Sequence, residues 1–244
     1  MIAVLSGGTG GAKFIQGLAQ ALASGNADGK LAPGQLSIIV NTGDDLTWWG
    51  LHVSPDLDSV MYGLAGMLSR ERGWGIEGET LACLEAAGRL GLPTWFQLGD
   101  RDLALHLART ELLRSGKTLS EATADLGHRL GIAAAVLPMT DARVETRVRT
   151  SAGELHFQEY FVRERHRPEP LAVRFAGVEK SQPAPGVLAA IAAAEAIVIA
   201  PSNPITSIGP ILAVPGIRAA LRRTTAPVAA ISPIIDGAAV SGPA

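Results

Sequence analysis

Cysteine is nearly absent from this chain of 244 residues, which contains only Cys83. An internal disulfide therefore cannot form, and a single thiol fits a reducing cytoplasm. Cys83 lies in an apolar run with helical spacing, which favours a buried, inert thiol over a nucleophile. Long apolar segments are also missing, since no stretch approaches the ~20 residues of a membrane span and the first residues lack a signal-peptide pattern. We therefore expect a cytoplasmic protein that binds no membrane.

A strong excess of charge of one sign is missing as well. The 21 Lys and Arg residues nearly balance the 23 Asp and Glu residues, which gives a net charge of −2. This balance provides no general attraction to nucleic acid or anionic lipid. Any bound phosphate must be held by local geometry instead, so the sequence predicts a small-molecule pocket and no nucleic-acid partner.

The chain does contain enough apolar residues for one large core. Hydrophobic residues make up 47% of it and charged residues 18%, which excludes a disordered chain. Strand-like runs lie at Ile2–Leu5, Leu36–Val40, Thr94–Leu98 and Ala196–Ala200, and helical spacing lies at Ala12–Ala23, Pro55–Leu68 and Asp100–Leu113. This alternation predicts one α/β domain over residues 1–244, with a Rossmann-like, mostly parallel sheet and helices on both faces.

A different pattern lies inside this domain, between residues 140 and 175. Two strand-like runs, Val144–Thr150 and Glu154–Val162, are separated by Ser151-Ala-Gly153. A short connection that contains glycine predicts an antiparallel hairpin. We expect this hairpin to form a small subdomain within residues 140–175.

The C-terminal end lacks a closing helix. The chain stops at Ala244, soon after the strand-like run Val228–Ile231. A doubly wound sheet normally covers its last strand. We therefore expect a domain that is shortened at its C-terminus, or a homodimer in which a second subunit supplies the missing cover.

The first polar cluster, Ser6-Gly-Gly-Thr-Gly-Gly-Ala-Lys13, follows the first predicted strand. Glycine N–H groups and the positive end of the following helix favour phosphate binding, and the lysine adds a charge. The residues predicted to bind the phosphates of a nucleotide are Gly7, Gly8, Thr9, Gly10 and Lys13. The spacing matches neither a P-loop nor a complete dinucleotide fingerprint, so a tight turn that needs glycine is the alternative.

Four carboxylates form the next clusters, Asp44 and Asp45 after the second predicted strand, and Asp56 and Asp58 at a predicted helix start. Near a phosphate loop they would repel the phosphate unless a hard cation intervened. Mg²⁺ held by one or two carboxylates and phosphate oxygens resolves this conflict. The alternative for Asp56 and Asp58 is helix capping alone, because the helix dipole stabilises a carboxylate in the first turn.

Two further clusters lie at predicted strand ends. Ser202-Asn-Pro-Ile-Thr-Ser207-Ile-Gly209 offers an amide, hydroxyls and a glycine that suit a base or a diphosphate, with a plain turn as the alternative. Gly99-Asp100-Arg101-Asp102 combines charge with a helix start, which N-capping and surface charge explain equally well. The five histidines show no metal-ligand spacing, so we interpret them as structural or surface residues.

Taken in order, these motifs resemble the 2-phospho-L-lactate transferase family, whose members make the deazaflavin coenzyme F-420. The matching segments are Leu5-Ser-Gly-Gly-Thr-Gly, Val40-Asn-Thr-Gly-Asp-Asp45, Val53-Ser-Pro-Asp-Leu-Asp58, Trp74-Gly-Ile, Leu98-Gly-Asp-Arg-Asp-Leu-Ala104, Leu137-Pro-Met-Thr-Asp141, His156-Phe-Gln-Glu159, Pro201-Ser-Asn-Pro-Ile-Thr-Ser-Ile-Gly-Pro210, Val214-Pro-Gly-Ile-Arg218 and Ile231-Ser-Pro-Ile-Ile235. Together they span nearly the whole chain, so the resemblance is specific.

The resemblance implies a reaction with Mg²⁺ as the cofactor. Lactyl-2-diphospho-5′-guanosine, or its enolpyruvyl analogue, donates its phospho-acid to the ribityl hydroxyl of 7,8-didemethyl-8-hydroxy-5-deazariboflavin, and GMP leaves. The resemblance implies that Asp45, Asp56 and Asp58 bind the metal and that Asp58 and Asp45 act in catalysis. It implies that the glycine loop binds the guanosine diphosphate together with Ser202, Asn203, Ser207 and Gly209. The residues implied to bind the deazaflavin are Asp56, Asp58, Gln97, Asp100 and Arg101.

Two other functions stay open on the sequence. Related proteins of the same superfamily bind nucleotide sugars and act in the regulation of cell-envelope growth, and they share the glycine-rich start. The acidic motifs favour the transferase over such a regulator. A nicotinamide dehydrogenase fits less well, because the second predicted strand ends in Asn41 instead of the usual ribose-binding acid.

Overall fold

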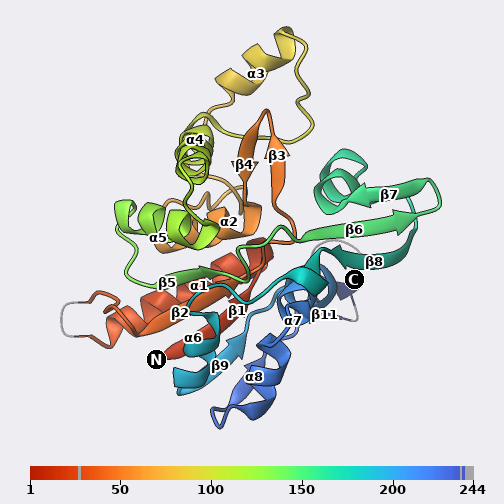
Figure 1. Cartoon of the computed structure of the whole chain (residues 1–244). Coiled ribbons are helices and arrows are strands. Elements are labelled where there is room, and N and C mark those ends of the chain that lie inside the picture. The colour runs from red at the N-terminus through yellow and green to blue at the C-terminus, as the bar shows by residue number, and fades with distance from the viewer. Residues whose placement is uncertain (27–28, 237, 240–244) are drawn as a thin grey trace.

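The computed structural model describes residues 1–26, 29–236 and 238–239. Within them a parallel sheet has the strand order β10-β9-β1-β2-β5 (Figure 1). Its strands are β10 (Val228–Ala230), β9 (Ala196–Ile199), β1 (Ile2–Ser6), β2 (Leu36–Val40) and β5 (Ala135–Pro138). The predicted α/β fold with a mostly parallel sheet is confirmed.

Helices cover both faces of this sheet (Figure 1). The hydrophobic cluster on one face includes side chains from α1 (Gly8–Ser24), α2 (Pro55–Leu64), α4 (Asp100–Arg114) and α5 (Leu119–Arg129). The cluster on the other face includes side chains from α6 (Val187–Ala193), α7 (Gly209–Ala213) and α8 (Ile217–Arg223). This two-sided cover is the arrangement expected of a parallel sheet.

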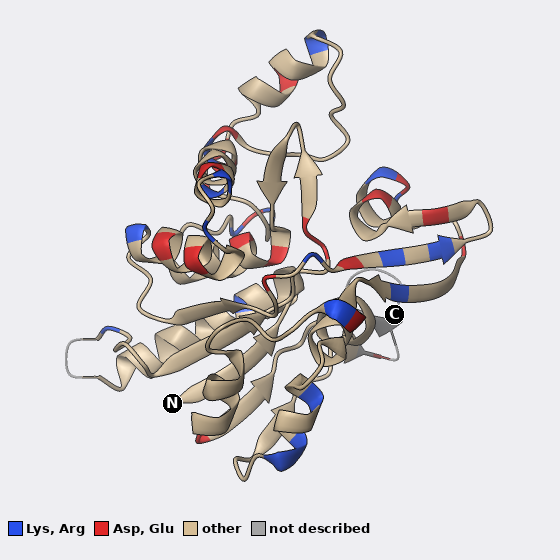
Figure 2. Cartoon of the chain, in the orientation of Figure 1, with Lys and Arg blue, Asp and Glu red and all other residues tan. Residues whose placement is uncertain are grey.

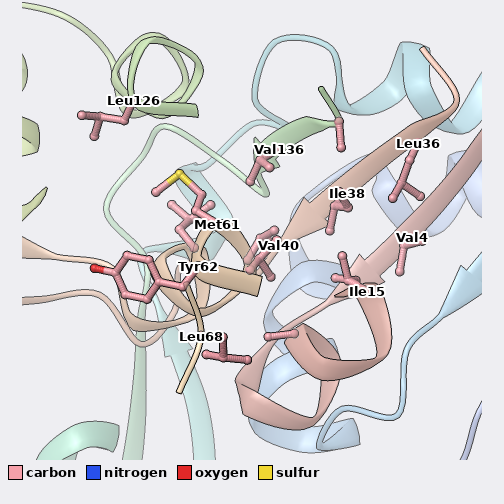
Figure 3. Packing of buried hydrophobic residues seen from close by; sticks show 14 of the residues in the cluster. Val4, Ile15, Leu36, Ile38, Val40, Met61, Tyr62, Leu68, Leu126 and Val136 are labelled. Atoms are coloured by element: carbon pink, nitrogen blue, oxygen red, sulfur yellow. The ribbon is translucent and has the colours of Figure 1, made fainter. Parts of the chain in front are cut away.

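Side chains of the central strand β1 belong to both hydrophobic clusters. Val4 packs with α1 and α2, whereas Ala3 and Leu5 pack on the opposite face, and all three are fully buried. Figure 3 shows the first cluster, in which Ile15 of α1 and Met61 of α2 lie over the strands. Because successive strand residues point to opposite faces, a strand covered on both faces has an uninterrupted apolar sequence.

The strand order reverses at β1. Leu5 pairs with Ile39 of β2 on one side and with Ile199 of β9 on the other. The chain first moves outward through β2 and β5, and then returns to place β9 beside β1. In open parallel sheets ligands bind beyond the carboxyl ends of the strands at such a reversal. We therefore expect a ligand-binding site in the loops that follow β1 and β9.

A smaller antiparallel sheet has the order β7-β6-β8, with β6 (Glu145–Thr150), β7 (Gly153–His156) and β8 (Pro170–Ala176). It confirms the predicted hairpin but not its full length. The second arm ends at His156 rather than Val162, because the chain turns into a π-helix, η1 (Glu159–Arg163). A separate hairpin, β3 (Leu46–Trp48) with β4 (Leu51–Val53), was not predicted.

Two predictions for the middle of the chain are wrong. The run Thr94–Leu98 is a loop between α3 (Ala82–Arg89) and α4, and β5 takes the place of the strand predicted there. Trp95 and Phe96 of this loop pack against Trp48 of β3, so aromatic packing explains the apolar run. Cys83 is exposed, because α3 projects from the fold and buries little of its surface (Figure 1).

Short elements complete the described chain, namely η2 (Val178–Lys180), η3 (Pro204–Ile208), β11 (Ile234–Ile235) and β12 (Ala238–Ala239). Across the described ranges no single helix is long and apolar enough to cross a membrane. Only the bent pair Pro204–Ala213 and Ile217–Arg223, at 86°, meets the length and composition requirement together. Residues 240–244, on which the expected C-terminal shortening rests, lie outside the described residues. The homodimer and the cytoplasmic location stay predictions.

Close packing at the start of α1 requires glycine at position 11. A Cβ there would lie 2.2 Å from Ser6 Oγ and 2.5 Å from Ser202 Oγ, whereas a Cβ at Gly17 meets no described atom within 4 Å. We predict that Gly11→Ala lowers the free energy of unfolding by about 1–3 kcal/mol through overpacking. The control Gly17→Ala should raise it by up to about 1 kcal/mol, because alanine favours a helix. Urea denaturation measures both, and equal stabilities would contradict the packing argument.

Candidate active site

A cavity of about 990 Å³ lies at the edge of the sheet where β1 and β9 end. Residues from the loops after β1 and β9, from α2 and α4 and from the segment around η1 line it. The predicted site residues in its lining are Gly7, Gly8, Thr9, Gly10, Lys13, Asp56, Asp58, Gln97, Ser202, Asn203 and Ser207. The predicted residues Asp45, Asp100, Arg101 and Gly209 are described but do not line it. The fold thus brings most of the predicted site into one cavity.

Two hydrogen bonds join the glycine loop to the loop after β9. Gly7 N–H donates to Ser202 Oγ at 3.2 Å, and this hydroxyl donates to the Gly7 carbonyl at 2.7 Å. Gly8 has a φ of +68°, a conformation that favours glycine. The Gly8 N–H at the start of α1 donates to the Asp56 carboxylate, and the N-cap residue Gly7 itself has no side chain. The following N–H groups and the positive dipole end of α1 suit a phosphate, with Lys13 of the same helix in the cavity lining.

The loop after β9 is shaped by its own hydrogen bonds. Asn203 Oδ1 accepts from the N–H groups of Ile205 and Thr206, at 2.9 and 3.0 Å, and so caps η3. Asn203 and Ser207 line the cavity beside this turn. Gly209 has a packing role instead, because a Cβ there would lie 2.9 Å from the Phe175 ring.

Two carboxylates of the cavity lining, Asp44 and Asp56, are buried close to the glycine loop. Asn41 Nδ2 donates to Asp56 Oδ2 at 2.9 Å, and a Cβ at Gly7 would lie 2.6 Å from that oxygen. Asp44 Oδ1 is buried without a hydrogen-bond partner in the described part of the chain. Figure 2 shows acidic positions on α2 and on the turn before β3, and basic positions on β6.

Burial and mutual repulsion change the ionisation of this pair. Burial raises the pKa of Asp44 well above its ordinary value, and the negative charge of Asp56 raises it further. Burial raises the pKa of Asp56 to about 6, against the opposing hydrogen bond from Asn41. Neighbouring buried carboxylates with an oxygen left unpaired suit a divalent cation, which relieves their repulsion. Among the described residues, no group of three or more His, Cys, Asp or Glu side chains is placed to hold a metal.

The two other predicted metal ligands already have protein partners. Asp45 Oδ2 accepts from Ser54 Oγ at 2.8 Å and lies 3.1 Å from His52 Nε2. Asp58 forms a two-point ion pair with Arg109, in which Nη1 donates to Oδ2 at 3.2 Å and Nη2 donates to Oδ1. Arg109 is fully buried. Asp58 therefore has both oxygens bonded to Arg109, and Asp45 does not line the cavity, although its Oδ1 is unpaired among the described residues. Asp44 and Asp56 are the better candidates to hold a cation there.

Sequence reasoning missed two polar side chains of the cavity wall, Tyr62 and His106, and named Asp102 only as part of the cluster at residues 99–102. Tyr62 Oη donates to Asp102 Oδ1 at 2.5 Å. Burial raises the pKa of Asp102 to about 6, although the tyrosine hydrogen bond opposes this. The available signal was spacing, because Tyr62 follows Asp58 by four residues on α2 and His106 follows Asp102 by four on α4.

Asp100 and Arg101, predicted to contact the deazaflavin, serve local structure. Asp100 accepts from Thr80 Oγ1 at 2.6 Å and from the Cys83 N–H at 2.9 Å, which secures the start of α3. Arg101 Nη1 donates to the Glu77 carbonyl at 3.1 Å. Asp100 therefore caps α3 and not the helix that it opens, whose N-cap is Gly99.

Aromatic rings form another part of the cavity wall. Besides Tyr62 and Tyr160, the rings that line it are Trp74, Trp95, Phe96, Phe157 and Phe161. Phe157, just before η1, and Phe161, within η1, are stacked with their ring centroids 5.4 Å apart. The Arg163 guanidinium lies 5.6 Å from the Trp95 ring centre. Flat aromatic surfaces beside a phosphate-binding edge suit a ligand with a large planar ring.

The family model described as 2-phospho-L-lactate transferase CofD matches residues 2–244. The chain belongs to this family. This transferase is 48% identical over 246 residues to the phosphoenolpyruvate transferase of Streptomyces griseus subsp. griseus, an alignment that covers 99% of the chain and 74% of the relative. It is also 48% identical over 245 residues to the phosphoenolpyruvate transferase of Mycobacterium tuberculosis strain H37Rv, over 96% of the chain and 74% of the relative.

A solved structure supports the fold of this transferase. The crystal structure of protein BH3568 from Bacillus halodurans matches with a TM-score of 0.64 and 19% sequence identity. The match covers 94% of this chain and 67% of that chain. At this identity the likeness concerns the fold alone.

The Asp58–Arg109 pair yields a stability prediction. Arg109→Leu leaves the Asp58 carboxylate buried without its partner, so we expect the free energy of unfolding to fall by about 3–5 kcal/mol. Arg129→Leu is the control, because Arg129 is 57% exposed and pairs with Asp125 on the surface of α5. Its loss should cost less than about 1 kcal/mol. Thermal and urea denaturation compare the two, and similar losses would argue against a buried ion pair.

Proposed function

We propose that this transferase moves a phospho-acid from a guanylylated donor to the ribityl hydroxyl of 7,8-didemethyl-8-hydroxy-5-deazariboflavin, in the biosynthesis of coenzyme F-420. The observation that carries the proposal is one cavity that combines a phosphate-binding helix start, buried acidic side chains and an aromatic wall. Because the relatives at 48% identity are named phosphoenolpyruvate transferases, we favour the enolpyruvyl donor over the lactyl donor.

The donor is assigned to the side of the cavity formed by the loops after β1 and β9. There the N–H groups at the start of α1 and the Lys13 ammonium would neutralise its diphosphate. Ser202, Asn203 and Ser207 line the same side and would bind the guanosine portion or the diphosphate. The acidic wall on α2 and α4 is unfavourable for an anionic donor, so the acceptor is assigned there.

Mg²⁺ is the proposed cofactor. Asp44 and Asp56 would hold it, because both line the cavity, repel each other and leave Asp44 Oδ1 without a partner among the described residues. One or two carboxylates with phosphate oxygens and waters form a common Mg²⁺ site. The ion would add positive charge beside the transferred group. This assignment replaces Asp58, whose two oxygens bond to Arg109, and Asp45, which does not line the cavity.

The reaction requires positioning rather than a covalent enzyme intermediate. The P–O bond to GMP breaks, a P–O bond to the ribityl oxygen forms, and the hydroxyl proton leaves. Asp58 is the candidate to orient that hydroxyl or accept its proton, since it lines the cavity and Arg109 fixes its carboxylate. General-base action is worth about 10²–10⁴-fold in rate. Wild-type turnover by Asp58→Asn at saturating Mg²⁺ would exclude this role.

The reaction itself provides the first test. The purified protein is incubated with Mg²⁺, the deazaflavin and either the enolpyruvyl or the lactyl diphosphoguanosine. We predict GMP release together with a deazaflavin product whose mass has increased by the phospho-acid, and faster turnover with the enolpyruvyl donor. Absence of a product with both donors, combined with tight binding of a uridine diphosphate sugar, would support a nucleotide-sugar-binding protein instead.

The metal assignment predicts the effect of Asp44→Asn. We expect the Mg²⁺ concentration for half-maximal activity to rise at least about tenfold, because the amide is a neutral and weaker ligand for a hard cation. Stability should stay the same or increase, since a buried, repelled carboxylate is removed. Asp125→Asn is the control, because this residue forms surface ion pairs with Lys117 and Arg129. An unchanged Mg²⁺ dependence for Asp44→Asn would refute the assignment.

A further inference from the structure

His106 is a cavity-lining side chain with one ring nitrogen left unused. It lies on α4, lines the cavity and is only 1% exposed. Its Nε2 is buried and has no hydrogen-bond partner among the residues that the structure describes. An unpaired buried polar atom costs free energy, and such atoms are uncommon in folded proteins. A ligand atom in the cavity would remove this cost.

The Nδ1 edge of the ring lies beside protein groups. His106 Nδ1 lies 3.5 Å from Arg109 Nη1 and 3.6 Å from Asp58 Oδ2, beside the buried ion pair. The backbone carbonyl of His106 accepts from Thr110 Oγ1 at 2.6 Å within the same helix. The ring therefore has one edge beside the Asp58–Arg109 ion pair and one buried nitrogen without a partner among the described residues, so a ligand atom that reached this nitrogen would complete its hydrogen bonding.

The neighbours of His106 indicate which ligand it would bind. Burial lowers its pKa to about 4, so the ring is neutral near pH 7 and offers no charge to a phosphate. Asp58, Tyr62 and Asp102 line the same side of the cavity. This wall of carboxylates disfavours an anionic diphosphate, whereas it suits the hydroxyl and carbonyl groups of an uncharged polyol ring system.

We propose that His106 is a specificity-determining residue whose Nε2 hydrogen-bonds an oxygen or nitrogen of the deazaflavin acceptor. The inference rests on the proposed function and extends it to a residue outside the predicted site. His106 would recognise the acceptor by hydrogen bonding and shape, because its ring carries no charge. A site built to bond a polar ligand atom discriminates strongly against analogues that lack it.

The test uses two amide substitutions that differ in reach. His106→Gln places its amide near the former Nε2 position, whereas His106→Asn places it near Nδ1 and leaves the outer position empty. Binding of the deazaflavin and of GDP is measured separately by calorimetry, with a thermal melt for each variant. His128→Asn is the control, because His128 is exposed on α5.

We expect His106→Asn to weaken deazaflavin binding at least about fivefold, in line with the loss of a buried hydrogen bond. His106→Gln should recover most of the affinity, and GDP binding should stay within about twofold in both variants. Equal deazaflavin affinity in wild type and His106→Asn would overturn the inference and leave the proposed function intact. Weakened GDP binding alone would overturn it in favour of a donor contact. A wild-type protein that binds GDP but no deazaflavin would overturn both.

Discussion

The contact between Gly7 and Ser202 is the constraint on which the site depends. Two hydrogen bonds join these residues across a sequence separation of 195, at the point where the strand order of the sheet reverses. Side chains larger than hydrogen at Gly7 or Gly11 would collide with the neighbouring loop or with α2. The glycines therefore serve packing as well as phosphate binding, since the closeness of the two loops shapes the cavity edge.

Buried charge divides the cavity into two chemical parts. Near the glycine loop, Asp44 and Asp56 repel each other, and no cationic side chain in the described part of the chain compensates them. On α2 and α4, Arg109 pairs with Asp58, and Tyr62 bonds to Asp102. A carboxylate pair without such a cation suits a metal and anionic phosphates, while a network in which His106 Nε2 is left unpaired among the described residues suits a neutral ligand that supplies the missing hydrogen bond. The same residue type thus has different chemistry depending on its partners.

Sequence patterns predicted the features that local rules determine, namely β1, β2, β9, the helices that follow the polar clusters, and the glycine loop. They failed where tertiary contacts decide the outcome. The run Thr94–Leu98 looks like a strand, yet its aromatic residues pack against the β3–β4 hairpin. Asp45 and Asp58 could not be separated from Asp44 and Asp56, because only the fold forms the cavity wall and brings Arg109 to Asp58. His106 was missed since only the fold places it in a cavity wall.

The two loops that form the cavity edge lie far apart in the sequence, so they are synthesised at different times. Residues near position 7 leave the ribosome first, whereas those near position 202 emerge after most of the chain has been synthesised. Because domains generally fold as units, the half with α1 and α2 has only one side of its ligand crevice until β9 has been synthesised. A nascent chain would therefore gain its binding competence late, when β9 inserts beside β1.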